Sequence, residues 1–351
     1  MPQKEYPLYD KDIKDRTRSW VMINLREGLE VYRDRPVHLS WKVPAFLNND
    51  WLALRLVQYC EDMGADRPFD MVYGAPHCIW AGGRPSSYTK EMTKDQLEAY
   101  FSAYERHGIT VALTFSRLGI DKNMVKDPYG NLILSVAEKH NAQAIVADDR
   151  LARKIRNDYP HMRLIASYDR TVTTLAARGF SDETQYYKQA FGLYDEVVLR
   201  CEYALDDALI NELPKELLGK CEVLVNQMCV PNCTVCEKHI RGIEDWAFGS
   251  RKDVPCPPCY HLKDVGDPAR RLERNVLLSN KRINELAAMG MGRFKIGGRN
   301  APPQKFVDLF VDYIFEPTGA ITVLKTGLVG ELGMLQRKYP GFMQYNLPDG
   351  I

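Results

Sequence analysis

Five cysteines lie close together in the second half of the chain. Two pairs have the spacing Cys-x-x-Cys, Cys233 with Cys236 and Cys256 with Cys259, and Cys229 comes four residues before the first pair. Two thiolates on one tight turn can bind one metal ion, and a second pair completes four ligands. Four cysteine ligands suit either a tetrahedral zinc ion or a [4Fe–4S] cluster. The spacing therefore predicts a metal centre held by four of these five residues, and it leaves the metal open.

Free buried thiols are the alternative interpretation. The five cysteines fall within 31 residues that also contain several prolines and polar side chains, which is unlike a buried apolar segment. The other four cysteines stand apart and are interpreted as small buried hydrophobic residues; they are Cys60, Cys78, Cys201 and Cys221. Clustered cysteines in a chain without a visible secretory signal favour metal or redox chemistry over disulfides. We therefore expect a cytoplasmic protein.

Composition narrows the range of partners. The chain has 351 residues, of which 45% are hydrophobic and 26% charged, with a formal net charge of +1. A large nucleic-acid footprint is unlikely at this charge, because neutralising many phosphates needs many cations. No stretch approaches the roughly 20 apolar residues of a membrane span. A small-molecule or nucleobase substrate and a protein partner or electron donor remain compatible with these numbers.

Eight short apolar runs alternate with segments of helical periodicity, as in a parallel sheet with helical crossovers. The predicted strands are 37–41, 69–73, 110–115, 144–147, 163–167, 196–199, 222–225 and 293–296. The predicted helices are 50–63, 94–107, 149–158, a segment from an N-cap at Ser181 to about Phe191, 275–289, and one that begins at Pro302 and Pro303. Eight such units predict a (β/α)₈ TIM-like barrel; an open doubly wound sheet is the alternative.

The long connection after the seventh strand carries the cysteines. We expect an N-terminal arm or cap over 1–36, a barrel over 37–317 that includes a Cys-rich insertion over 227–269, and a C-terminal extension over 318–351. A loop of this length usually has a function or a bound group that organises it.

Four residues near predicted strand ends are candidates for catalysis, because active sites of barrels form where the strands end. Lys295 and Arg299 lie at the end of the eighth strand, a common site for anions, and His77 follows the second strand and could act as a base. Asp148 could form an acid–base pair with Asp149, although we expect Asp149 to cap the helix that follows.

Over roughly residues 105–316 the chain resembles the collagenase-like peptidase family, known as U32. The stretches that carry the resemblance are 144–153, 163–167, 195–200, 222–229 and 294–299. The resemblance implies a TIM-like barrel and, for Cys-rich members, a [4Fe–4S] cluster. Several such members support oxygen-independent hydroxylation of RNA bases or quinone precursors, whereas others carry a peptidase label.

The resemblance also bears on the ligand set. Cys229 and Cys236 keep a Cys-x₆-Cys pattern of many members, and Cys229 and Cys233 keep the Cys-x₃-Cys pattern of others. The resemblance implies a ligand set of Cys229, either Cys233 or Cys236, and both Cys256 and Cys259. One departure is Gly297, which stands where the family has a glutamate.

Our leading hypothesis is an iron–sulfur-dependent enzyme that carries out a redox modification, most plausibly oxygen-independent hydroxylation of a planar organic or nucleobase substrate. A peptidase is the first alternative, although neither a Gly-x-Ser-x-Gly nor a His-Glu-x-x-His motif occurs. A zinc-stapled, non-enzymatic binding or assembly subunit is the second.

Overall fold

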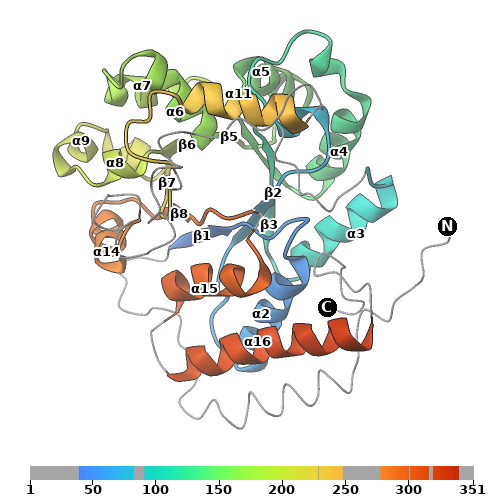
Figure 1. The fold of residues 1–351 in the computed structure, drawn as a ribbon. Helices are drawn as coiled ribbons and strands as arrows, with labels where there is room; N and C mark the ends of the chain where they lie inside the picture. Colours follow the sequence, from blue (N-terminus) through green and yellow to red (C-terminus); the bar gives the residue numbers. More distant parts are fainter. Residues whose placement is uncertain are drawn as a thin grey trace.

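The strands close into a barrel in the computed structural model, which describes residues 39–82, 91–227, 229–247, 277–299, 301–315 and 319–339. Each strand pairs in parallel with the next, and β8 pairs with β1 (Figure 1). The strands are β1 (Ser40–Val43), β2 (Met71–Gly74), β3 (Thr110–Phe115), β4 (Gln143–Val146), β5 (Leu164–Ala166), β6 (Glu196–Leu199), β7 (Cys221–Leu224) and β8 (Arg293–Lys295). The predicted TIM-like barrel is confirmed, and the open sheet is excluded.

Helices follow the strands around the outside of the barrel (Figure 1). They are α2 (Asp50–Asp62), α3 (Lys94–Glu105), α4 (Pro128–Lys139), α5 (Asp149–Asp158), α6 (Tyr168–Ala177), α7 (Glu183–Ala190), α8 (Cys201–Ala204), α9 (Asp207–Asn211), α10 (Lys215–Leu218), α11 (Cys236–Ala247), α14 (Asn280–Ala288), α15 (Pro303–Ile314) and α16 (Gly319–Lys338), with short 3₁₀ turns η1 (Ile79–Ala81) and η2 (Met124–Lys126).

Two predicted helix caps are wrong. The N-cap of α5 is Asp148, whose carboxylate accepts hydrogen bonds from the backbone N–H groups of Arg150 and Leu151. Asp149 was expected in this role, but it lies one residue inside the helix. Ser181 does not cap α7 either: its hydroxyl donates to the carbonyl of Arg178, and Asp182 takes the N-cap position.

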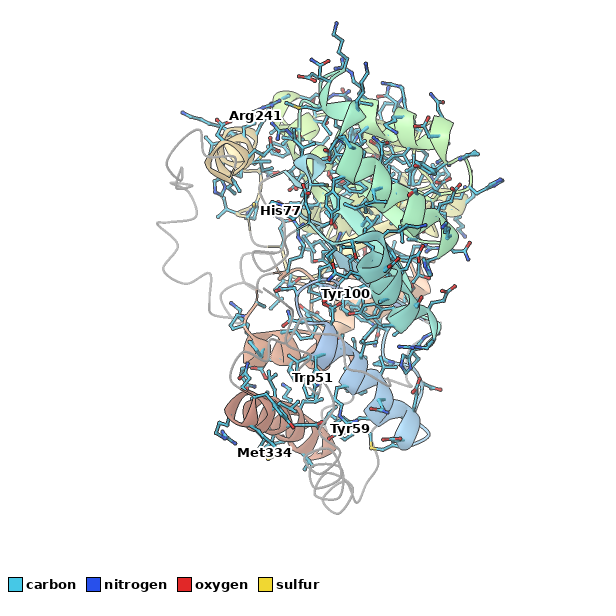
Figure 2. The ribbon with its side chains drawn as sticks, turned by 90° about the vertical axis from the view of Figure 1, so that its right-hand side faces the viewer. Trp51, Tyr59, His77, Tyr100, Arg241 and Met334 are labelled. Atoms are coloured by element: carbon cyan, nitrogen blue, oxygen red, sulfur yellow. The ribbon has the colours of Figure 1, made fainter. Side chains whose placement is uncertain are left out.

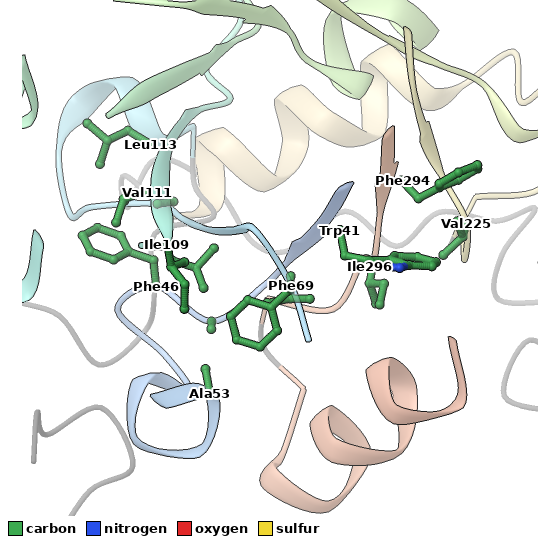
Figure 3. Packing of buried hydrophobic residues seen from close by; sticks show 14 of the residues in the cluster. Trp41, Phe46, Ala53, Phe69, Ile109, Val111, Leu113, Val225, Phe294 and Ile296 are labelled. Atoms are coloured by element: carbon green, nitrogen blue, oxygen red, sulfur yellow. The ribbon is translucent and has the colours of Figure 1, made fainter. Parts of the chain in front are cut away.

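The main core lies between the outer faces of the strands and the helices. Successive residues of a strand point to opposite faces, so Trp41 and Phe294 face outward while their neighbours Lys42 and Lys295 are left for the barrel interior. The rings of Trp41 and Phe294 lie 5.6 Å apart, and Tyr313 of α15 lies 5.9 Å from Trp41. Figure 3 shows Trp41 and Phe294 close to each other in this core. Strand alternation therefore fixes which side chains line the barrel.

The last described helix belongs to the same folded unit. Helix α16 packs against α2 and α15 (Figure 1). The guanidinium of Arg55 pairs with the carboxylate of Glu331 at 3.0 Å, and the hydroxyl of Tyr59 donates to the same carboxylate at 3.0 Å. Figure 2 shows α2 and α16 together at one end of the molecule. The predicted C-terminal extension thus packs on the barrel over its described residues.

None of the described helices combines the length and the hydrophobicity of a membrane-spanning segment.

Candidate functional site

A cavity of about 300 Å³ opens where the strands end. Its walls come from β2, β3, β4, β7, β8, the start of α6 and one side of α11. Polar side chains that line it include Tyr73, Thr114, Ser116, Asp169, Asn226, His239, Lys295 and Arg299. A volume of this size suits a small molecule. Two of the candidate catalytic residues, Lys295 and Arg299, therefore share one cavity.

Lys295 ends β8 and is only 6% exposed. Its Nζ lies 4.1 Å from the centre of the Tyr73 ring, and the Tyr73 hydroxyl donates to the carbonyl of Ile296 at 2.8 Å. Burial lowers the pKa of Lys295 to about 7, and the positive charges of Lys42 and Arg299 act in the same direction. The ammonium group can therefore lose its proton near neutral pH.

A second set of charges lies deeper in the barrel. Lys42 forms an ion pair with Glu222, and its Nζ lies 3.9 Å from the carboxylate of Glu196. Glu196 is also paired with Arg163 at 2.8 Å and with Arg293 at 3.0 Å. The two glutamates are each 1% exposed. A buried charge is tolerated only when it is paired, so these five charged side chains form a structural network.

Glu196 and Glu222 were not predicted from the sequence as site residues. Their positions did indicate an unusual environment, since both are charged residues within predicted apolar strands. In a half-buried strand such a residue marks the face opposite to the apolar one, and in a barrel that face is the interior.

The loop after β8 brings Arg299 to the cavity. Asn226, just after β7, holds this loop: its amide Nδ2 donates to the carbonyl of Gly297 at 3.1 Å, and its Oδ1 accepts from the N–H of Gly297 at 2.5 Å. A Cβ at Gly297 would lie 3.2 Å from that Oδ1, a tight contact. Gly298 has a φ of +123°, which favours glycine. Arg299 then donates to the hydroxyl of Ser116 at 3.5 Å.

Three cysteines surround a second, smaller pocket beside the cavity. Cys229, Cys233 and Cys236 all line it, together with Tyr168, Val172, Phe180, Arg200, Glu202, Val230 and Asn232. Cys233 and Cys236 are 7% and 3% exposed, and Cys229 is half-buried. Burial, reinforced by the neighbouring Cys233, raises the pKa of Cys236 to about 11. Cys229 also lines the large cavity, so the two spaces meet at this residue.

Charged side chains hold the cysteine loop in place. Arg200 makes a bidentate ion pair with Glu183, with its Nη2 at 2.6 Å, and donates to the side chain of Asn232 at 2.7 Å. Glu202 accepts hydrogen bonds from the Asn232 N–H and from the Gln227 side chain, both at 3.2 Å. The loop position is thus fixed by residues that follow β6 and β7.

Cysteine thiolates are suitable ligands for a zinc ion or an iron–sulfur cluster. Part of this set of cysteines lies outside the described residues. Cys256 and Cys259 belong to that part. Within the described residues, no group of three or more His, Cys, Asp or Glu side chains has a metal-binding arrangement by itself.

The other two candidate catalytic residues lie elsewhere. His77 is exposed and is not among the cavity-lining residues; in Figure 2 it lies toward the same side as Arg241 of α11. Asp148 caps α5 and also accepts a hydrogen bond from the N–H of Ile120 at 3.0 Å. Asp149 is paired with Arg170 at 2.6 Å. These contacts give both aspartates structural roles.

Comparisons with known proteins find similarity among solved structures. Neither a scan against protein-family models nor a search of curated proteins finds a match. Among solved structures, the chain is similar to one titled "The Structure of the U32 Peptidase Mk0906", with a TM-score of 0.43 and 12% sequence identity; the match covers 77% of this chain and 97% of that chain.

Proposed function

We propose that this protein is an enzyme with a cysteine-ligated [4Fe–4S] cluster beside the large cavity, and that it modifies a small planar substrate by redox chemistry. The most plausible reaction is oxygen-independent hydroxylation of an organic molecule or a nucleobase. One observation carries the proposal: Cys229 lines both the cysteine pocket and the cavity. A centre bound by this cysteine would lie next to a molecule in the cavity.

The proposed ligands are Cys229, Cys233 or Cys236, and the pair Cys256 and Cys259. When bound, a cluster of this kind supplies electron transfer that amino-acid side chains cannot provide. The deep burial of Cys233 and Cys236 supports this assignment, because a site shielded from water protects a cluster and tunes its potential.

The cavity itself suits a planar molecule with a polar edge. Tyr73 and Tyr168 contribute aromatic walls, and Ile145 and Ile243 contribute aliphatic ones. A nucleobase could enter such a pocket only as a flipped or single-stranded base. Arg299 offers a guanidinium for an anionic or carbonyl group.

Metal analysis tests the centre. Protein purified without oxygen should be brown and contain about four irons and four sulfides per chain. Cys229→Ala should lose most of the iron, whereas Cys60→Ala should keep it, because Cys60 is buried in α2 away from both pockets. Colourless protein with one zinc per chain would instead support the zinc-stapled alternative.

Product analysis tests the reaction. Cells with and without the gene should be compared by mass spectrometry of hydrolysed RNA and of small aromatic metabolites after growth without oxygen. We expect a species one oxygen heavier that depends on the gene and is lost in the Cys229→Ala strain. Gene-dependent cleavage of unfolded collagen or random peptides, with no such species, would support the peptidase alternative.

A further inference from the structure

Two lysines lie side by side inside the barrel. Lys42 of β1 and Lys295 of β8 are direct partners in the strand register. Both are almost fully buried, at 3% and 6% exposure. Two like charges at adjacent positions repel each other, and burial penalises each of them further. A buried ammonium group in this position therefore needs a compensating partner.

The two amines differ in their surroundings. Lys42 has two carboxylates near it, Glu222 in an ion pair and Glu196 at 3.9 Å. Lys295 instead lies over the Tyr73 ring, and in the described part of the chain no carboxylate lies within 4 Å of its Nζ. Lys295 is therefore the less well paired of the two buried amines.

Charged groups from every neighbouring element act on Lys295. Glu222 from β7 and Asp169 from α6 favour its protonated form, whereas Lys42 from β1 and Arg299 from the loop after β8 oppose it. Burial is the largest influence and opposes protonation as well, so that the pKa falls to about 7. A substantial share of this amine is neutral at physiological pH and faces an open cavity.

We propose that Lys295 is a nucleophile that forms an imine with a carbonyl compound carrying an anionic group, and that Arg299 binds that group. Desolvation and a neighbouring cation are the two features that activate lysine amines for this chemistry. The proposal concerns the same cavity as the proposed function but does not require the cysteine centre.

The chemistry balances without any oxidant or reductant. The lone pair of Nζ attacks the carbonyl carbon, so a C–N bond forms and the C=O π bond opens to give a carbinolamine. The C–O bond then breaks, and the oxygen leaves as water with the two protons of the amine. The buried Thr114 hydroxyl lines the cavity and has no hydrogen-bond partner among the described residues. This hydroxyl can donate a hydrogen bond to an oxygen atom of a compound bound in the cavity.

Reductive trapping tests the proposal on the full chain. Purified protein is incubated with pyruvate and sodium cyanoborohydride, digested, and mapped by mass spectrometry. We expect one reductively attached pyruvate, on Lys295, with a rate that is half-maximal near pH 7. Methyl pyruvate has the same carbonyl without the negative charge, so it should react several-fold more slowly.

Matched variants separate this result from surface labelling. Lys295→Arg keeps a cation but cannot form the imine under these conditions, and it should abolish the specific adduct. Lys281→Arg changes an exposed lysine, 87% exposed at its side chain, and should leave the adduct on Lys295 unchanged. Adducts spread over surface lysines with none on Lys295 in the wild-type protein would overturn the proposal, and so would a rate that rises only near pH 10.

Mapping the adduct on the wild-type protein by mass spectrometry tests the proposal even if a variant does not fold. Iron content is measured on the same preparation, so a protein with iron but no adduct separates failure of this inference from failure of the proposed function.

Discussion

Buried charged side chains have different kinds of partner at the two ends of the barrel interior. Near the strand starts, Glu196 and Arg293 open β6 and β8 and are paired with each other, and Glu222, the register partner of Arg293, pairs with Lys42 from the level of Lys295. Near the strand ends, Lys295 lies over an aromatic ring beside a cavity of about 300 Å³. Paired charges hold an architecture together, whereas a buried amine without an ion-pair partner in the described chain has a strongly shifted pKa and marks a reactive site.

The largest expected effect comes from breaking the paired end. Glu222→Ala leaves the Lys42 ammonium buried beside a single carboxylate at 3.9 Å, and removing one partner of a buried pair costs about 3–5 kcal/mol. Lys295→Met keeps a similar volume and should cost less than about 1.5 kcal/mol. Urea denaturation of both variants measures the difference, and equal losses would contradict the contrast between the two ends.

A buried carboxyl outside the barrel sharpens the comparison. Asp50 begins α2 without a cation partner in the described residues, and burial raises its pKa from 3.8 to about 7 although the hydroxyl of Tyr104 donates to it at 2.7 Å. The folded state keeps a proton that the unfolded chain releases, so stability falls as pH rises from about 4 to about 7. The full shift corresponds to roughly 4 kcal/mol at most.

Asp50→Asn should remove this part of the pH dependence, because the amide cannot ionise. The measurement is the free energy of unfolding of wild type and variant across that pH range. Parallel curves would show that Asp50 ionises normally in the folded protein.

A smaller effect is expected at the helix cap. Asp148→Ala removes two hydrogen bonds to the start of α5 and one to Ile120, and loss of an N-cap costs about 1 kcal/mol, up to about 2. The melting temperature should fall by a few degrees, while pyruvate trapping on Lys295 keeps its rate. Loss of trapping in a variant that still folds would instead indicate that Asp148 takes part in the reaction with pyruvate.

The smallest expected change concerns the balance of charges at the cavity. The guanidinium of Arg299 helps to lower the pKa of Lys295, so Arg299→Gln should move the pH of half-maximal trapping upward with little change in stability. The same variant should remove the preference for pyruvate over methyl pyruvate. An unchanged pH profile would show that Arg299 does not act on this amine.

The barrel could be predicted from the sequence because strand and helix signals are local. One strand was misplaced, 37–41 against the observed Ser40–Val43, because the inward-facing Lys42 interrupts the apolar run. The site was harder to predict, since it depends on which strands meet. Lys42 lies next to Lys295 only because β8 closes onto β1. His77 follows a strand end as expected, but that rule does not give the direction in which the side chain points.

The cysteine motif indicated a metal centre from spacing alone, and the structure adds that Cys229, Cys233 and Cys236 share a pocket. That the pocket borders the cavity could not be predicted, because the contact joins α6, the loop after β7 and α11.

Mössbauer spectroscopy of protein produced without oxygen on isotopically enriched iron tests the central claim most directly. The account predicts the signal of a four-iron cluster in wild type, retained in Cys60→Ala and lost in Cys229→Ala. A wild-type protein that binds no iron and holds one tightly bound zinc would contradict it.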